Sequence, residues 1–272
     1  MLDKSILLNS IKKYSTPQYL YDLPAILTRI NELKRQLPSS VALYYAVKAN
    51  PNLKLLAHLK SSVDGLDISS AGEIKQSILA KYNPQKMNFA GPGKTDKEIE
   101  YALKENVGSF SIESQNDLER IESISAKLKT KTKVILRINP SKIINKFAVK
   151  MGGKATQFGI DEEDLDSVIN NAKQSKFINL IGLHIYAGTQ CLDAPSLLEY
   201  FTDTLCLAEK LIKKHQLNCQ IINFGGGFGV DYFANDKPLN IDEFYQIFPE
   251  LLKNFENKTK KNQDILLSWD VT

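Results

Sequence analysis

Cysteine is scarce in this chain of 272 residues. Its three cysteines, Cys191, Cys206 and Cys219, are odd in number and show no C-x-x-C spacing. This disfavours a disulfide framework and a zinc site, and it is typical of reduced thiols in a cytoplasmic protein. Long apolar runs are also missing: no stretch approaches the roughly 18 apolar residues that cross a bilayer, and Met1 to Leu8 is too short an apolar run for a signal peptide. We therefore expect a cytoplasmic protein with no membrane partner.

A strong charge imbalance is missing as well. The formal net charge is +4, from 35 Lys and Arg against 31 Asp and Glu, and the basic residues lie in small scattered groups. Because no basic face is interleaved with aromatic residues, a nucleic-acid partner is disfavoured. The length and the 43% of hydrophobic residues suffice for one large core.

What the sequence does contain is an alternation of short β-rich apolar runs with longer amphipathic segments. Eight strands joined by helices favour an α/β fold of the TIM type, a (β/α)₈ barrel, over an open sheet. Residues 20–35 read as a helix that enters the first strand, so we expect a lead-in segment at 1–35 and a barrel at 36–272. The predicted strands are 42–48, 63–68, 87–91, 108–112, 133–139, 180–188, 220–224 and 264–269.

Helix-start signals follow several of the predicted strands. Ser70-Ala71-Gly72-Glu73 and Thr95-Asp96-Lys97-Glu98 both fit the capping box, and Ser114 to Asp117 is a weaker version of it. The stretch from Lys142 to Gly159 is rich in Lys and Gly and has little periodicity. We interpret it as a long active-site loop.

One lysine stands at the end of the first predicted strand. The run Val41 to Val47 leads into Lys48, and Asn50-Pro51 then stops the strand. Parallel α/β folds place their chemistry at this end of their strands. An amine held there can form a Schiff base with an aldehyde if its surroundings lower its pKa. The alternative is an ordinary solvated lysine.

A glycine run follows the seventh predicted strand. Gly225, Gly226, Gly227, Phe228 and Gly229 come directly after an apolar segment. Glycines at a strand end allow backbone N–H groups to approach an anion closely, although a flexible turn is the simpler alternative. Barrels often bind phosphate near the seventh and eighth strands. An aldehyde for the lysine and a phosphate for the glycines together fit pyridoxal 5'-phosphate.

The sixth predicted strand adds aromatic and hydroxyl groups. By the two-residue strand period, His184, Tyr186 and Gly188 share a face. If that face is the interior, two rings line the barrel mouth and one can stack on a pyridine ring. Thr189 can offer a hydroxyl to the phosphate. For His184 the alternative is a hydrogen-bonded core histidine.

Charged residues end two further strands. Asp67 and Ser69 end the second strand, and Glu73 lies one helical turn on, as a catalytic acid or merely a capping residue. Arg137 ends the fifth strand. A buried arginine there needs an acidic partner or an anionic ligand, which favours a role in the site.

These residues resemble a known family over nearly the whole chain and in order. Four segments, 45–50, 67–73, 182–190 and 225–229, look like the fold type III (alanine-racemase-like) pyridoxal-phosphate decarboxylases, the group of diaminopimelate and ornithine decarboxylases. The resemblance implies that Lys48 is the Schiff-base lysine, and that Thr189 and the glycine run surround the phosphate. It implies that Asp67, Arg137 and His184 line the pocket. It further implies a homodimer and a small amino-acid substrate.

The chain departs from that family at two places. Where diaminopimelate decarboxylases carry a second histidine that stacks on the cofactor, this chain has Tyr186, which points to a less typical branch, including siderophore or antibiotic pathways. In the family the eighth strand leads into Glu-x-Gly-Arg, whose acid keeps the pyridine nitrogen protonated. This sequence instead reads Ile265 to Thr272 at that place, and we expect it to lack the family's C-terminal β domain. Residues 267–272 can be encoded by codons whose bases, read in a shifted frame, give Glu-Leu-Gly-Arg-Tyr, which contains the missing motif. We therefore hypothesise a frameshift there.

The resemblance implies decarboxylation of an amino acid. Without the usual acid, we expect the 272-residue chain to bind cofactor weakly and to turn over little or no substrate. Three alternatives stay open: an amino-acid racemase, a cofactor-carrier protein, and a non-catalytic remnant that binds cofactor or partners.

Overall fold

The computed structural model describes residues 3–142, 156–186 and 188–259 in full, and the backbone of 149–150 and 266–271. The chain divides into two compact units, residues 1–36 and 37–272. The first unit carries helices α1 (Lys4–Tyr14) and α2 (Leu23–Gln36). Helix α1 begins at Asp3, whose carboxylate accepts a hydrogen bond from the backbone N–H of Ser5 at 2.6 Å.

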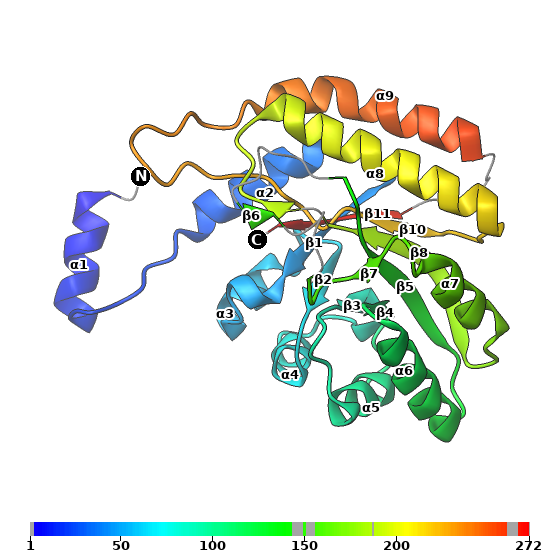
Figure 1. Cartoon of the computed structure of the whole chain (residues 1–272). Helices are drawn as coiled ribbons and strands as arrows, with labels where there is room; N and C mark the ends of the chain where they lie inside the picture. The colour runs from blue at the N-terminus through cyan, green and yellow to red at the C-terminus, as the bar shows by residue number, and fades with distance from the viewer. Residues whose placement is uncertain (1–2, 143–148, 151–155, 187, 260–265, 272) are drawn as a thin grey trace. The chain divides into compact units, whose positions relative to one another are not determined.

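The second unit is a closed barrel of eight parallel strands, which confirms the predicted fold (Figure 1). Each strand pairs with its neighbours, and pairings of β4 with β5 and of β1 with β11 close the ring. A two-residue strand, β7 (Ile160–Asp161), adds to the end of β5. The barrel strands are β1 (Val41–Ala46), β2 (Gly65–Ile68), β3 (Met87–Phe89), β4 (Ser109–Ile112), β5 (Thr132–Asn139), β8 (Ile178–Ile185), β10 (Ile221–Asn223) and β11 (Leu266–Val271).

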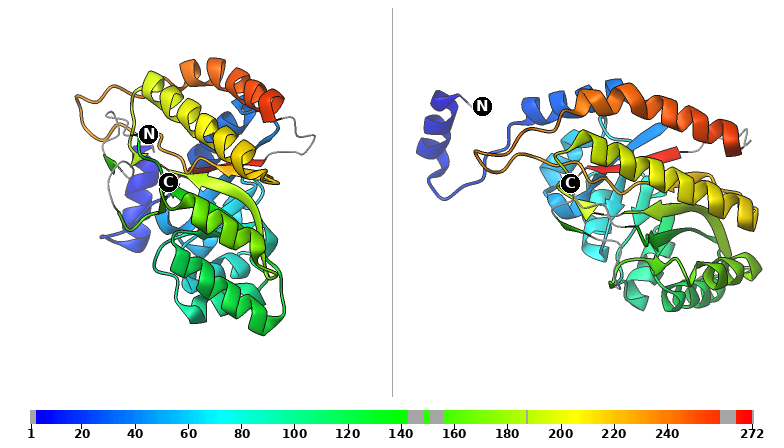
Figure 2. Two further views of the ribbon diagram at one scale, coloured as in Figure 1. Left: turned by 45° about the vertical axis from the view of Figure 1, so that its right-hand side comes forward. Right: turned by 45° about the horizontal axis from the view of Figure 1, so that its top comes forward.

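Helices on the outside connect successive barrel strands (Figure 2). Their apolar faces cover the strands because each has buried residues at helical spacing, as Leu118, Ile121 and Ile124 show in α6. The last two helices lie side by side on one flank of the barrel. The helices are α3 (Leu53–Leu59), α4 (Ala71–Leu79), α5 (Asp96–Lys104), α6 (Gln115–Leu128), α7 (Leu165–Gln174), α8 (Ala194–His215) and α9 (Ile241–Thr259), with short 3₁₀ turns η1 (Val47–Ala49) and η2 (Pro84–Lys86).

An aromatic cluster fills the space between α8, α9 and β10. The ring of Phe201 lies 4.5 Å from that of Phe224, 5.0 Å from Phe244 and 5.1 Å from Phe248, centroid to centroid. All four side chains are buried. Burial of several rings in one place makes this cluster a major source of stability for this side of the barrel.

Several predicted strands were too long at their carboxyl ends, and two of these, the first and the sixth, carry predicted site residues beyond the true strand end. The first stops at Ala46, because the chain tightens into the 3₁₀ turn η1 that carries Lys48. The sixth stops at Ile185. Gly188 belongs instead to a separate two-residue strand, β9 (Gly188–Thr189), which pairs with β6 (Val149–Lys150). The two-residue period that put Gly188 on one face with His184 therefore does not extend that far.

The predicted helix starts are confirmed, with one change in their partners. At α5, Thr95 and Glu98 form the reciprocal capping box. At α4, the hydroxyl of Ser70 accepts from the N–H of Glu73, but the Glu73 carboxylate accepts from Ser69 at 2.7 Å. Most of the predicted loop at 142–159 lies outside the described residues.

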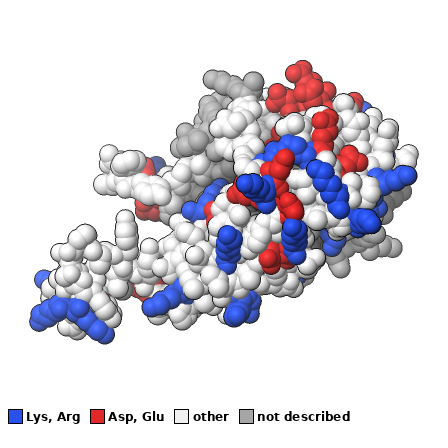
Figure 3. Space-filling view, turned by 90° about the horizontal axis from the view of Figure 1, so that it is seen from below, with Lys and Arg blue, Asp and Glu red and all other residues white. Residues whose placement is uncertain are grey.

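No helix among the described residues is long and apolar enough to cross a membrane. On the face shown in Figure 3, basic and acidic side chains lie interspersed. Exposed ion pairs of the protein include that of Lys104 with Glu100, 2.6 Å apart.

Candidate active site

A cavity of about 500 Å³ opens at the carboxyl ends of the barrel strands. Parallel barrels place their functional groups at this end, where loops rather than packed strands form the surface. Seven of the predicted site residues line it, together with a loop after β3 and a phenylalanine before β7. The lining residues are Lys48, Asp67, Ser69, Ala90, Gly91, Pro92, Gly93, Arg137, Phe158, His184, Tyr186, Thr189 and Gly225.

Lys48 is the amine of the cavity. The turn η1 follows β1 directly, so the side chain starts from a rigid strand end and is exposed at the cavity. Its positive charge lowers the pKa values of Asp67, Glu73 and His184. Lys48 therefore interacts electrostatically with an acid on β2, an acid on α4 and an imidazole on β8.

Asp67 is a buried carboxylate on β2. Burial raises its pKa to about 6, and this outweighs the opposing effects of a hydrogen bond from Asn88 and the charges of Lys48 and Arg137. Burial likewise raises the pKa of the half-buried Glu73 carboxyl, against a hydrogen bond from the Ser69 N–H. Both acids thus lie nearer to protonation at neutral pH than ordinary carboxylates.

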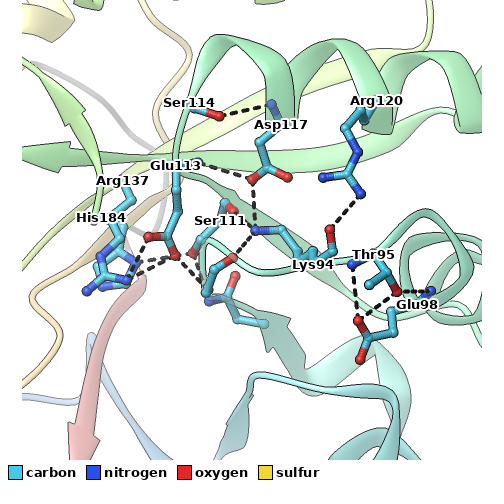
Figure 4. Close-up of polar contacts among 12 residues, drawn as sticks. Lys94, Thr95, Glu98, Ser111, Glu113, Ser114, Asp117, Arg120, Arg137 and His184 are labelled. Atoms are coloured by element: carbon cyan, nitrogen blue, oxygen red, sulfur yellow. Dashed lines mark hydrogen bonds and ion pairs between the residues drawn. The ribbon is translucent and has the colours of Figure 1, made fainter. Parts of the chain in front are cut away.

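Arg137 on β5 has the acidic partner that its burial predicts. Its Nη1 donates to both carboxylate oxygens of Glu113, at 2.9 and 3.0 Å (Figure 4). The guanidinium also contacts two rings: its central carbon lies 4.9 Å from the centroid of Phe158 and 5.8 Å from that of Tyr186. These contacts hold the cation at the cavity wall in one orientation.

His184 on β8 is buried next to Arg137 in the strand register. Its Nδ1 lies 3.1 Å from the Ser111 hydroxyl, and its Nε2 has no hydrogen-bond partner among the described residues. Burial, reinforced by the charges of Arg137, Lys48 and Lys94, holds its pKa well below 6.5. The ring is therefore a neutral imidazole at neutral pH.

The glycine run enters the cavity at its first residue. Gly225 has φ +74°, and a Cβ added there would lie 2.5 Å from Cδ2 of Tyr186, so both backbone and space require glycine. Its N–H donates to the Asn223 side chain at 2.7 Å. Gly226 and Gly227 continue with positive φ values.

The rest of the run takes another direction. The Phe228 ring lies 5.9 Å from Phe201 and 5.2 Å from Phe244, so its side chain packs in the aromatic cluster. Gly229 donates its N–H to the carbonyl of Cys191 at 2.9 Å, and Cys191 donates to Gly227 at 3.0 Å. Of the five residues at 225–229, Gly225 is the one among the described cavity-lining residues.

Two buried charges behind the cavity were missed in the sequence. Lys94 donates to the carbonyls of Gly91 and Ser111, at 2.6 and 2.9 Å, and lies 2.8 Å from Asp117. Glu113 accepts from the N–H of Gly91 at 2.6 Å as well as from Arg137 (Figure 4). The N–H and the carbonyl of Gly91 are thus both hydrogen-bonded to buried charged side chains. Lys94 stands just before a capping box, and no local pattern marks it as buried.

Comparisons with known proteins show to which family the chain belongs. The family model described as the pyridoxal-binding domain of pyridoxal-dependent decarboxylases matches residues 23–267. The chain belongs to this family. It is 35% identical, over 88% of its length, to L-glutamyl-[BtrI acyl-carrier protein] decarboxylase from Niallia circulans, of which it covers 56%. It is 32% identical, over 97% of its length, to 2-[(L-alanin-3-ylcarbamoyl)methyl]-2-hydroxybutanedioate decarboxylase from Staphylococcus aureus, of which it covers 65%.

Solved structures of the family have the same fold. Diaminopimelate decarboxylase from Helicobacter pylori, in complex with L-lysine, superposes with a TM-score of 0.86 at 28% identity, over 97% of this chain and 65% of that one. The chain thus spans between 56% and 65% of the length of these three relatives. The barrel corresponds to the pyridoxal-binding domain of the family.

Proposed function

We propose that this barrel binds pyridoxal 5'-phosphate through Lys48 and serves the decarboxylation of an amino acid, as in diaminopimelate decarboxylases. The observation that carries the proposal is the convergence of Lys48, His184, Arg137 and Gly225 on one cavity of about 500 Å³. When bound, this cofactor supplies an aldehyde for an amine and a ring that accepts the electron pair left when a carboxylate departs as carbon dioxide.

The residues present fit such a ligand. Lys48 offers the amine. The positive-φ backbone of Gly225 to Gly227 is of the kind that brings N–H groups close to a phosphate, here those that follow Gly225, because Gly225 donates its own N–H to Asn223. Thr189, at the same cavity, offers a hydroxyl to that group. The buried His184 Nε2, which has no partner among the described residues, is suited to bind a ligand atom.

The substrate side of the proposal is an amino acid with a free α-carboxylate. Arg137, held by Glu113 and two rings, is the cation of the wall that can attract an anionic group without reorganising. The names of the relatives from Niallia circulans and Staphylococcus aureus both contain an L-amino-acid unit within a larger substrate. The proposed class therefore includes such extended amino acids beside diaminopimelate.

An absorbance titration of the purified chain with pyridoxal phosphate tests the proposal. We expect a band near the visible edge that saturates with cofactor, is lost in Lys48→Ala and is kept in Lys54→Ala, an exposed lysine on α3. A band that survives in both variants would overturn the assignment of Lys48. The same titration measures the weak binding expected from the sequence, and carbon dioxide release from candidate amino acids measures turnover.

A further inference from the structure

A chain of buried hydrogen bonds runs behind the cavity from Asp67 on β2 to His184 on β8. Asn88 on β3 donates from Nδ2 to Asp67 Oδ1 at 3.0 Å and to the Ser111 hydroxyl at 3.1 Å. Ser111 on β4 in turn lies 3.1 Å from His184 Nδ1. All four side chains are buried, and the two end members line the cavity.

The donor and the acceptor of each of these hydrogen bonds follow from the neighbouring groups. The Ser109 hydroxyl donates to Asn88 Oδ1 at 2.9 Å, which leaves Nδ2 to face Asp67 and Ser111. Ser111 therefore accepts from Asn88 with its oxygen, and its own hydrogen is available for His184 Nδ1. A neutral imidazole that accepts at Nδ1 carries its proton on Nε2.

The Nε2–H group that results has no hydrogen-bond partner among the described residues. A buried N–H without an acceptor is unfavourable, so native proteins reserve such groups for water or ligands. The cations around it, Arg137, Lys48 and Lys94, favour a negative group at this place. A ligand oxygen with negative charge meets both conditions.

We propose that Ser111 and Asn88 are positioning residues that hold His184 as the Nε2–H tautomer, and that this N–H donates to a negatively charged oxygen of the pyridoxal ligand. The second half of this proposal rests on the proposed function. Two oxygen groups of that ligand carry the required charge, the ring hydroxyl in its ionised form and the phosphate. The positioning of His184 by Ser111 and Asn88 concerns the free protein alone.

Nitrogen-15 NMR of histidine-labelled protein at neutral pH tests the tautomer, since long-range couplings distinguish the two ring nitrogens. The chain has three histidines, and a His184→Gln sample assigns the signal. We expect the proton on Nε2 in the free protein, and a roughly tenfold change in the tautomer ratio in Ser111→Ala, which removes one hydrogen bond. A proton on Nδ1 in the unaltered protein would overturn the proposal.

Matched controls separate this effect from general disturbance. Ser125→Ala makes the same change at a buried serine of α6 that pairs with Thr132, and it should leave the His184 pattern unchanged. Ser111→Thr keeps the hydroxyl and should retain the tautomer. The signals of the exposed His58 and of His215, which pairs with Asp166, should not move in any variant.

Ligand addition then tests the donor role. Pyridoxal phosphate should shift the Nε2 resonance; a shift with pyridoxal alone assigns the ring oxygen, and a shift with inorganic phosphate alone assigns the phosphate. If the Lys48-dependent band forms while the Nε2 resonance stays in place, the donor role fails and the proposed function stands. If no band forms with any amount of cofactor, the proposed function fails, while the tautomer of the free protein still decides the positioning role.

Discussion

Two walls of the cavity are built from different interactions. The wall of β2, β3 and β4 is held by hydrogen bonds and buried charges, among them the pair of Lys94 with Asp117. The wall of β8 and β10 is packed against the aromatic cluster around Phe201, where the hydroxyl of Tyr200 donates to the carbonyls of Ile185 and Phe224.

The difference separates two tasks. Polar contacts on the first wall fix the charge state and direction of groups such as Asp67 and His184, because buried charges respond strongly to their neighbours. Packing on the second wall fixes shape, since Ile185 and Phe224 directly precede Tyr186 and Gly225. Changes on the first wall should therefore alter electrostatics, and changes on the second should alter geometry.

The largest effect is expected from Lys94→Met on the first wall. The change leaves Asp117 buried without its cation, which typically costs about 3–5 kcal/mol in the free energy of unfolding. Urea unfolding monitored by circular dichroism measures it. Lys104→Met, which breaks an exposed pair with Glu100, is the control and should cost no more than about 0.5 kcal/mol. Equal costs for the two variants would contradict the role given to the buried pair.

A smaller effect is expected from Tyr200→Phe on the second wall. The ring stays in the cluster, but the carbonyls of Ile185 and Phe224 lose their donor, at a cost of about 1–3 kcal/mol. Tyr232→Phe, at an exposed position, should change the free energy of unfolding by less than about 0.5 kcal/mol. If Tyr200→Phe left the free energy of unfolding nearly unchanged, packing alone would hold this wall.

The smallest effect is a pH dependence from Asp67. Because its pKa is raised in the folded protein, Asp67 favours folding when protonated, and this contribution is lost as the pH rises through about 6. Relative to Asp67→Asn, the free energy of unfolding should grow by about 1 kcal/mol between about pH 7 and about pH 5. His184 acts in the opposite sense, because its lowered pKa favours folding at higher pH, and the comparison with Asp67→Asn cancels it. Parallel pH curves for the two proteins would contradict the burial of an ionisable Asp67.

The barrel could be predicted from the sequence because its evidence is local. Each strand is a short apolar run, and starts such as Thr95 with Glu98 lie within one helical turn. The cavity residues Lys48, Asp67, Arg137 and His184 could be predicted because strand ends meet at one face of a barrel. Topology and the resemblance to the family together carried these predictions, without any knowledge of side-chain contacts.

The polar wall could not be predicted, because its contacts depend on register between strands distant in sequence. Asn88 and Ser111 read as unremarkable polar residues in short strands, and only the pairing of β2, β3 and β4 brings them together. Glu113 gains its importance from Arg137, 24 residues away. The place of the Phe228 ring has a related cause: it depends on the packing of α8 and α9, which no local signal reveals.

The most direct test of the central claim is to find the lysine that bonds to the cofactor. The chain would be mixed with pyridoxal phosphate, treated with sodium borohydride to make the bond between amine and aldehyde permanent, digested, and mapped by mass spectrometry. The account predicts the pyridoxyl group on Lys48, where the amine starts from the end of β1 and faces the cavity. Modification concentrated at another lysine, or spread evenly over exposed lysines such as Lys54, would contradict it.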